Sequence, residues 1–135
     1  MRWLIGVFLV WYVQFAFAGE FVVVVSSSSK VGLLDSNKVR DLFLKKRSFS
    51  GKQKLIPVNL LGDNEIRAEF ERSVLRMRRE EINHLWIKDH FLGISPPVTQ
   101  ASLASIRLFV ERVDGAIGYL PKDMVNDNLK IVHEF

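Results

Sequence analysis

Short apolar runs separate the polar segments of this chain and predict the strands of one sheet. Residues 21–25 form a continuous run of phenylalanine and valine, which is typical of a strand covered on both faces. Residues 54–59, 116–119 and 129–134 are expected to form three further strands. A polar loop of four serines, residues 26–29, follows the first run and ends that strand.

Apolar residues recur at helical spacing between these strands. Ile66, Phe70, Val74 and Met77 are four, four and three positions apart, which predicts one helix face with Ile66 and Phe70 in the core. Further helices are expected from Asp35 or Ser36 to residues 45–47, from about 79 to 93, and from about 102 to 113. The order β-α-β-α-α-α-β-β indicates an α/β fold with helices against one sheet.

The first eighteen residues have the pattern of a secretory signal. Arg2 gives a positive start, residues 3–13 are apolar, and Ala16 and Ala18 are the small residues of a cleavage site. The apolar run is shorter than a membrane-spanning helix needs. We expect removal of residues 1–18, which leaves a single domain at 19–135 that is periplasmic or otherwise exported and has no membrane span. An uncleaved anchor and a buried first helix are the alternatives.

Composition excludes several classes of chemistry. The chain of 135 residues has no cysteine, so disulfides, thiolate zinc sites and cysteine nucleophiles are ruled out. A Gly-x-Ser-x-Gly motif and a glycine-rich phosphate loop are both missing. Glu80, Glu81 and His84 have a spacing that suits a metal, but a second such pair is missing, so a surface charge pair is favoured. We expect no enzyme activity, no metal and no cofactor.

The formal net charge is +4, and the basic clusters lie beside acidic residues. Mixed signs on helical segments are typical of solvated faces. An exported basic domain can meet anionic solutes, whereas nucleic acid is not an expected partner.

The order and spacing of several segments resemble the phosphate-binding-like members of the periplasmic substrate-binding superfamily, which feed phosphate ABC transporters. The most specific segment is Gly-Ala-Ile-Gly-Tyr at 115–119, after an amphipathic helix. The other segments that carry the resemblance are 41–46, 55–59, 67–70, Trp86, 91–93 and 96–97. The resemblance implies one lobe of a two-lobed fold, with a small, mostly parallel sheet flanked by helices.

The resemblance also implies where an oxyanion would bind. The family uses an Arg, then Ser-Gly-Thr at a helix start, then a Phe. If Phe70 is that Phe, the Ser-Gly-Thr positions fall on residues 64–66 and the Arg position falls on Leu60. Asn64 keeps a hydrogen-bonding side chain, and Arg67 is the nearby cation.

Three more residues complete the candidate set of ligands. Ser27 and Ser28 offer hydroxyls at a strand end, although a flexible loop is the competing interpretation. Tyr119 offers a polar tip on a flat apolar ring, although sheet packing is the competing interpretation.

Two functions remain open from the sequence. The preferred one is an exported phosphate-binding-like domain that binds an oxyanion weakly, or acts as a sensory accessory of an envelope transport system. The rival is a protein–protein interaction module that has lost the solute site and contacts an envelope protein or a second copy. An interaction module needs an exposed apolar patch, for which Trp86 and Tyr119 are the candidates.

Overall fold

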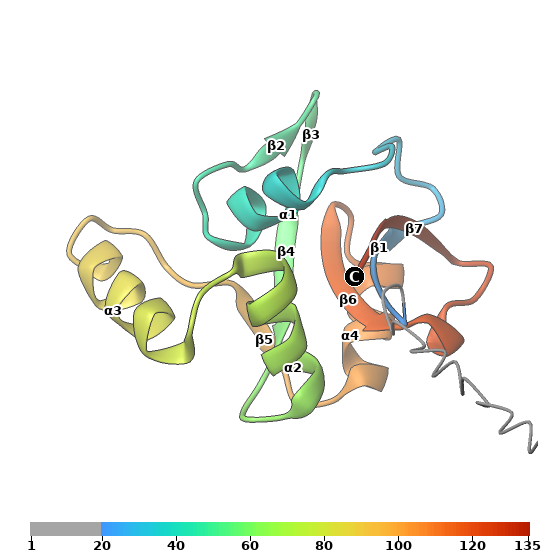
Figure 1. Ribbon diagram of the computed structural model, residues 1–135. Helices are drawn as coiled ribbons and strands as arrows, with labels where there is room; N and C mark the ends of the chain where they lie inside the picture. Colours follow the sequence, from blue (N-terminus) through green and yellow to red (C-terminus); the bar gives the residue numbers. More distant parts are fainter. Residues whose placement is uncertain (1–19) are drawn as a thin grey trace, which may run out of the picture.

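The computed structural model describes residues 20–135, and the predicted leader at 1–18 lies outside them. Five strands form one sheet in the order β5-β4-β6-β1-β7 (Figure 1). They are β1 (Phe21–Ser26), β4 (Ile56–Leu60), β5 (Val98–Gln100), β6 (Ala116–Pro121) and β7 (Leu129–Glu134). The β5 strand was not anticipated from the sequence, because its three residues are too few to show a period.

Four of the five strands run in the same direction. β4 pairs in parallel with both β5 and β6. β1 pairs antiparallel with β6 on one side and with β7 on the other, so β1 alone is reversed. The expectation of a small, mostly parallel sheet flanked by helices is therefore confirmed.

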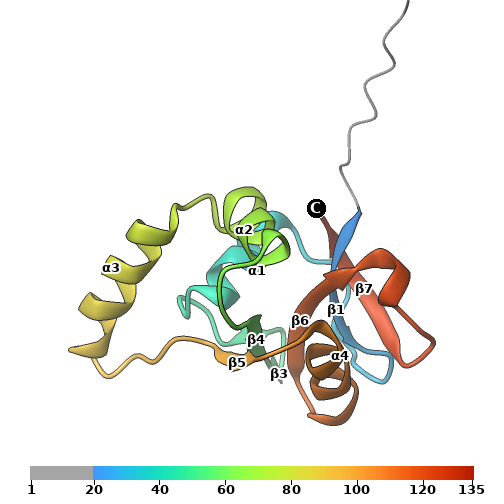
Figure 2. The same ribbon diagram turned by 90° about the horizontal axis from the view of Figure 1, so that it is seen from below.

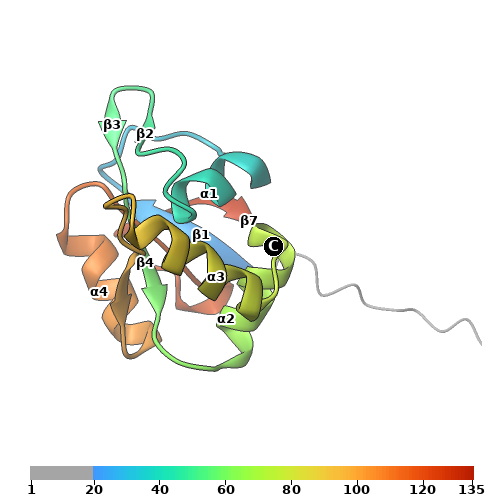
Figure 3. The same cartoon turned by 90° about the vertical axis from the view of Figure 1, so that its left-hand side faces the viewer.

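Helices cover both faces of this sheet. Helix α4 (Leu103–Arg112) packs on one face, and α1 (Ser36–Phe43) and α2 (Glu65–Phe70) lie on the other (Figures 2 and 3). The central valines of β1, Val22 to Val25, are at most 1% exposed because both faces are covered. The continuous apolar run at 21–25 was thus a correct indicator of a doubly covered strand.

Two neighbouring residues of β6 lie against opposite faces of the sheet. A β-carbon at Gly118 would lie 2.9 Å from both Ile106 of α4 and Val58 of β4, so only glycine allows α4 to sit this close to the sheet. The next residue, Tyr119, points to the opposite face, where its ring stacks on Phe70 with centroids 4.2 Å apart. Phe43 meets the edge of Phe70 at 4.7 Å and completes the aromatic core on that side.

Residues at the ends of the helices explain where the helices begin and stop. The Asp35 carboxylate accepts a hydrogen bond from the Lys38 amide, which starts α1 as expected. α1 ends at Phe43, earlier than the expected 45–47, because Lys45 adopts a left-handed φ of 61°. α2 continues as a π-helical turn, η1 (Glu71–Leu75).

The stripe predicted for α2 and η1 is largely confirmed. Phe70 and Val74 are fully buried, whereas Ile66 and Met77 are only half-buried at the ends of the stripe. The expectation that Ile66 lies in the core was therefore only partly correct.

Helix α3 (Arg79–His90) projects to one side of the molecule (Figures 1 and 2). Ile82 is its one fully buried side chain. Ile87, Phe91 and Leu92 are 62%, 83% and 67% exposed, on this helix or just after it. None of the helices in the described part of the chain is long and apolar enough to cross a membrane.

Candidate functional site

The carboxyl end of β4 and the start of α2 bring two of the predicted ligands together. The Asn64 side-chain oxygen accepts a hydrogen bond from the Arg67 amide at 2.9 Å and so caps α2. The Arg67 guanidinium turns back and donates to the Leu60 carbonyl at 3.0 Å. The Asn64 oxygen and Nη1 of Arg67 therefore have partners within the fold, whereas Nε of Arg67 is buried without a hydrogen-bond partner.

A buried carboxylate, Glu71, lies beside this arginine. Its side chain is 6% exposed, and one of its oxygens is 3.8 Å from Nε of Arg67. Nε of Arg79 donates to both carboxylate oxygens at 2.9 Å, and Nη2 of Arg79 donates to Oε1 at 2.5 Å. These hydrogen bonds raise the pKa of Arg79. One internal anion thus neutralises two guanidinium groups.

Asp63 extends this network to the surface. Its carboxylate accepts a hydrogen bond from Nη1 of Arg79 at 2.6 Å. Asp63 is just before α2, whereas Arg79 is the first residue of α3. The Glu71–Arg79–Asp63 network therefore fixes the base of the projecting helix against the body.

Tyr119 is part of the core and has no surface for a solute. Its side chain is fully buried, and its hydroxyl donates to Oδ1 of Asn59 and accepts from the Leu60 amide. Burial raises the pKa of Tyr119 to about 12. The structural interpretation of this residue explains every contact that it makes.

The serine loop lies away from the other candidates. Ser27 and Ser28 follow β1, which runs antiparallel to β4 and β6. They therefore lie at the opposite end of the strands from Asn64, which follows β4. Both are exposed, and the Ser28 hydroxyl is 2.9 Å from that of Ser26. The fold does not bring this pair to Asn64 and Arg67.

A hollow of about 690 Å³ opens between α2, η1 and the start of α3. Arginines and carboxylates line it in equal number, so the local charge is balanced. The arginines are Arg72, Arg76, Arg78 and Arg79, and the carboxylates are Asp63, Glu71, Glu80 and Glu81. A dianion would find little net attraction there.

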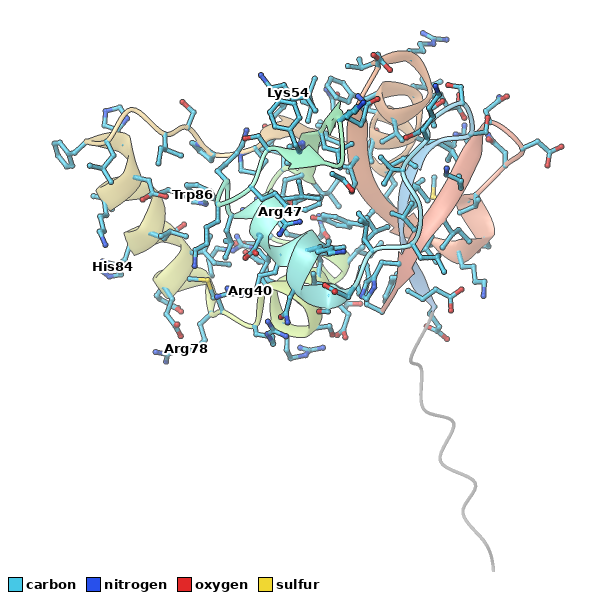
Figure 4. All side chains as sticks on the ribbon, turned by 90° about the horizontal axis from the view of Figure 1, so that it is seen from above. Arg40, Arg47, Lys54, Arg78, His84 and Trp86 are labelled. Atoms are coloured by element: carbon cyan, nitrogen blue, oxygen red, sulfur yellow. The ribbon has the colours of Figure 1, made fainter. Side chains whose placement is uncertain are left out.

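The Glu80, Glu81 and His84 cluster does not form a metal site. No group of metal-ligating side chains is found within residues 20–135. Glu81 instead pairs with Arg78 at 2.9 Å on the exposed surface. Figure 4 shows Arg78 and His84 along the outer part of α3, and Trp86 on its side toward the body.

Sequence reasoning missed Glu71 and Arg79 as residues of this site. The four-residue spacing of Arg67 and Glu71 was a usable signal, since such pairs share a helix face. The contact from Arg79 was not visible, because it depends on how α3 turns away after Arg76.

Comparison with known proteins adds the class of fold. No protein-family model and no curated protein sequence matches the chain. Solved structures of phosphate-transport proteins do match. An ABC-type phosphate transport receptor from Vibrio cholerae has a TM-score of 0.67 at 15% identity, over 86% of this chain and 46% of that one.

Two further structures give the same result. A putative phosphate ABC transporter substrate-binding protein with bound phosphate, from Clostridium perfringens, has a TM-score of 0.68 at 16% identity, over 85% of this chain and 44% of that one. PstS from Borrelia burgdorferi has a TM-score of 0.60 at 10% identity, over 85% of this chain and 47% of that one. The chain therefore has the α/β fold of one lobe of a periplasmic phosphate-binding protein, and it spans slightly less than half their length.

Proposed function

We propose that the chain is an exported accessory domain of an envelope transport or sensing system that acts through contact with another protein and binds free phosphate weakly or not at all. The observation that carries the proposal is the Glu71 carboxylate, which is buried against Arg67 and Arg79 where an anion would otherwise be needed. We propose no catalytic role for the domain.

The weak affinity follows from charge and from the missing half of the fold. Asp63 and Glu65 at the start of α2 oppose the attraction of its free amide groups for a dianion. The structures that the chain resembles are about twice as long, and closure of a second lobe is what removes water from a bound anion in a two-lobed fold. We expect a Kd of about 1 mM or weaker.

The apolar surface of α3 supports the contact with another protein. Ile87 and Phe91 are one helical turn apart, and both are mostly exposed, as is Leu92. Exposed apolar side chains gathered in this way are typical of an interaction surface. The patch replaces the one expected from the sequence, because Tyr119 is buried and Trp86 is half-buried.

Site-specific photo-crosslinking in the producing cells tests this contact. A benzoylphenylalanine at Phe91 should give an adduct of one defined mass, because the patch meets one partner. The same group at Asp123, an exposed site on the 3-10 turn after β6, is the matched control. Equal crosslinking at both positions, or none at Phe91, would refute the contact through α3.

Export is a separate part of the proposal. The exported protein should begin at or near Gly19, which mass spectrometry of the periplasmic fraction measures directly. Recovery of the chain with Met1 intact would refute cleavage and favour an anchored form.

A further inference from the structure

A basic surface lies at the end of the molecule opposite α2. The hairpin of β2 (Phe49–Ser50) and β3 (Gln53–Lys54) stands at that end (Figures 1 and 3). Residues 42–62 contain five cations and no carboxylate. We define the hairpin surface as the cations of this segment together with Lys30 and Phe49; the five are Lys45, Lys46, Arg47, Lys52 and Lys54.

The fold concentrates these cations. The hairpin turns at Gly51 and Lys52 and brings Lys54 back opposite Phe49. Lys30 joins them because the loop after β1 and the hairpin turn line one small hollow of about 260 Å³. Figure 4 shows Arg47 and Lys54 on this face, apart from Arg78 before the start of α3.

These cations are not compensated within the fold. Among residues 20–135, none of the six forms an ion pair, whereas Arg67, Arg72, Arg78 and Arg79 all do. Burial and the nearby charge of Lys54 lower the pKa of Lys45. An anionic surface that approaches these cations lowers the electrostatic repulsion between them.

An apolar side chain stands among the cations. Phe49 is 52% exposed, and its side chain shares a face of the hairpin with that of Lys54 because the two residues are directly paired. An aromatic ring flanked by long basic side chains fits the boundary of a bilayer, where the ring enters the headgroup layer and the cations meet lipid phosphates. A soluble polyanion would need the cations but not the ring.

We propose that the hairpin surface docks this domain on a bilayer that contains anionic phospholipid. The contact is peripheral: Phe49 enters the headgroup layer and the surrounding cations bind lipid phosphates. Docking through the hairpin leaves the α2 end of the molecule facing away from the bilayer.

Vesicle partitioning of the protein purified from the producing cells tests the proposal. Vesicles of phosphatidylcholine with about 30% phosphatidylglycerol are compared with pure phosphatidylcholine, so that the neutral vesicles measure any contribution from the N-terminus. Lys46→Gln with Lys52→Gln should weaken binding to the anionic vesicles about 25-fold, at about five-fold per cation. The matched control, Lys88→Gln with Lys122→Gln, removes the same formal charge from α3 and from the 3-10 turn after β6, where Lys122 pairs with Glu134. It should change binding less than about three-fold.

Phe49→Ser distinguishes a bilayer from other polyanions. It should weaken binding to the anionic vesicles about five-fold or more, since the ring no longer enters the headgroup layer. Binding that depends on the lysines but not on Phe49 would refute the bilayer and assign the surface to a soluble polyanion. Equal partitioning on neutral and anionic vesicles, or equal loss in the control pair, would also refute the proposal.

A unique label gives an independent readout. Because the chain has no cysteine, Ser50→Cys carries one environment-sensitive fluorophore on the hairpin. Its emission should shift to the blue on anionic vesicles, whereas the same label at Asp123→Cys should not. A shift at Asp123 without one at Ser50 would place a different face on the membrane.

Discussion

Removal of Glu71 should both destabilise the fold and create an anion site. In Glu71→Ala, Arg67 and Arg79 lose the carboxylate that they share. Two partly buried cations are then left close together with one acceptor fewer. The matched control is Glu69→Ala, which removes a more exposed carboxylate of the same helix that pairs with Arg72.

The magnitude follows from burial. Loss of one partner of a buried ion pair costs about 3–5 kcal/mol. Arg79 is 28% exposed and keeps Asp63, and Arg67 keeps the Leu60 carbonyl. We therefore expect Glu71→Ala to lower the free energy of unfolding by about 2–4 kcal/mol, against less than about 1 kcal/mol for Glu69→Ala.

Phosphate should partly rescue the variant. Urea denaturation is measured with and without about 10 mM phosphate at constant ionic strength. With a Kd of about 0.1 mM for the vacated site, the variant gains roughly 2.7 kcal/mol of stability, whereas the wild type, at its expected Kd of about 1 mM or weaker, gains at most about 1.4 kcal/mol. If Glu71→Ala costs no more than Glu69→Ala, or if phosphate stabilises both proteins equally, the reasoning is wrong.

Three further outcomes follow from the core and the turns. Phe70→Ala should cost about 3–5 kcal/mol, because it leaves a cavity against Tyr119, and an unchanged denaturation midpoint would contradict this. The pKa of Tyr119 is lower in the unfolded chain, so raising the pH from about 10 to 12 should cost the wild type about 2 kcal/mol that Tyr119→Phe does not lose. Denaturation series at each pH would measure this loss. Lys45→Gly should raise the free energy of unfolding by about 1 kcal/mol, because glycine adopts the left-handed φ without strain and removes repulsion from Lys54; thermal denaturation that shows no gain would contradict this.

Local patterns were enough to predict most of the elements. The valine run of β1 and the α4 helix both follow from period and capping, and both are found. For the Gly-Ala-Ile-Gly-Tyr segment, the sheet-packing interpretation that stood beside a ligand role for Tyr119 fits the structure, since Gly118 admits α4 and Tyr119 fills the other face. These features depend on residues close in sequence, which is why a single sequence reveals them.

The position of α3 could not be predicted from the sequence. Its apolar residues do not define a single buried face, and Phe91 is exposed although Ile82 is buried. Whether such a helix packs or projects depends on the left-handed Arg76 at the end of η1 and on the link from Arg79 to Glu71. Neither the turn at Arg76 nor the contact of Arg79 with Glu71 can be inferred from the periodicity of apolar residues.

The candidate site was predicted in part. Asn64 and Arg67 do lie together at the start of α2, as the resemblance implied, but both are engaged inside the fold. The position of Ser27 and Ser28 could not be predicted without the strand directions. The reversal of β1 places them at the opposite end of the strands from the start of α2. Glu71 was overlooked because a carboxylate on a helix is usually a solvated charge.

Calorimetric titration of the wild-type protein with phosphate, and with sulfate as a second oxyanion, tests the central claim most directly. Since Glu71 already neutralises Arg67 and Arg79, the account predicts a Kd of about 1 mM or weaker for both anions. A micromolar Kd for phosphate on the monomer would contradict the account and restore solute binding as the function of this lobe.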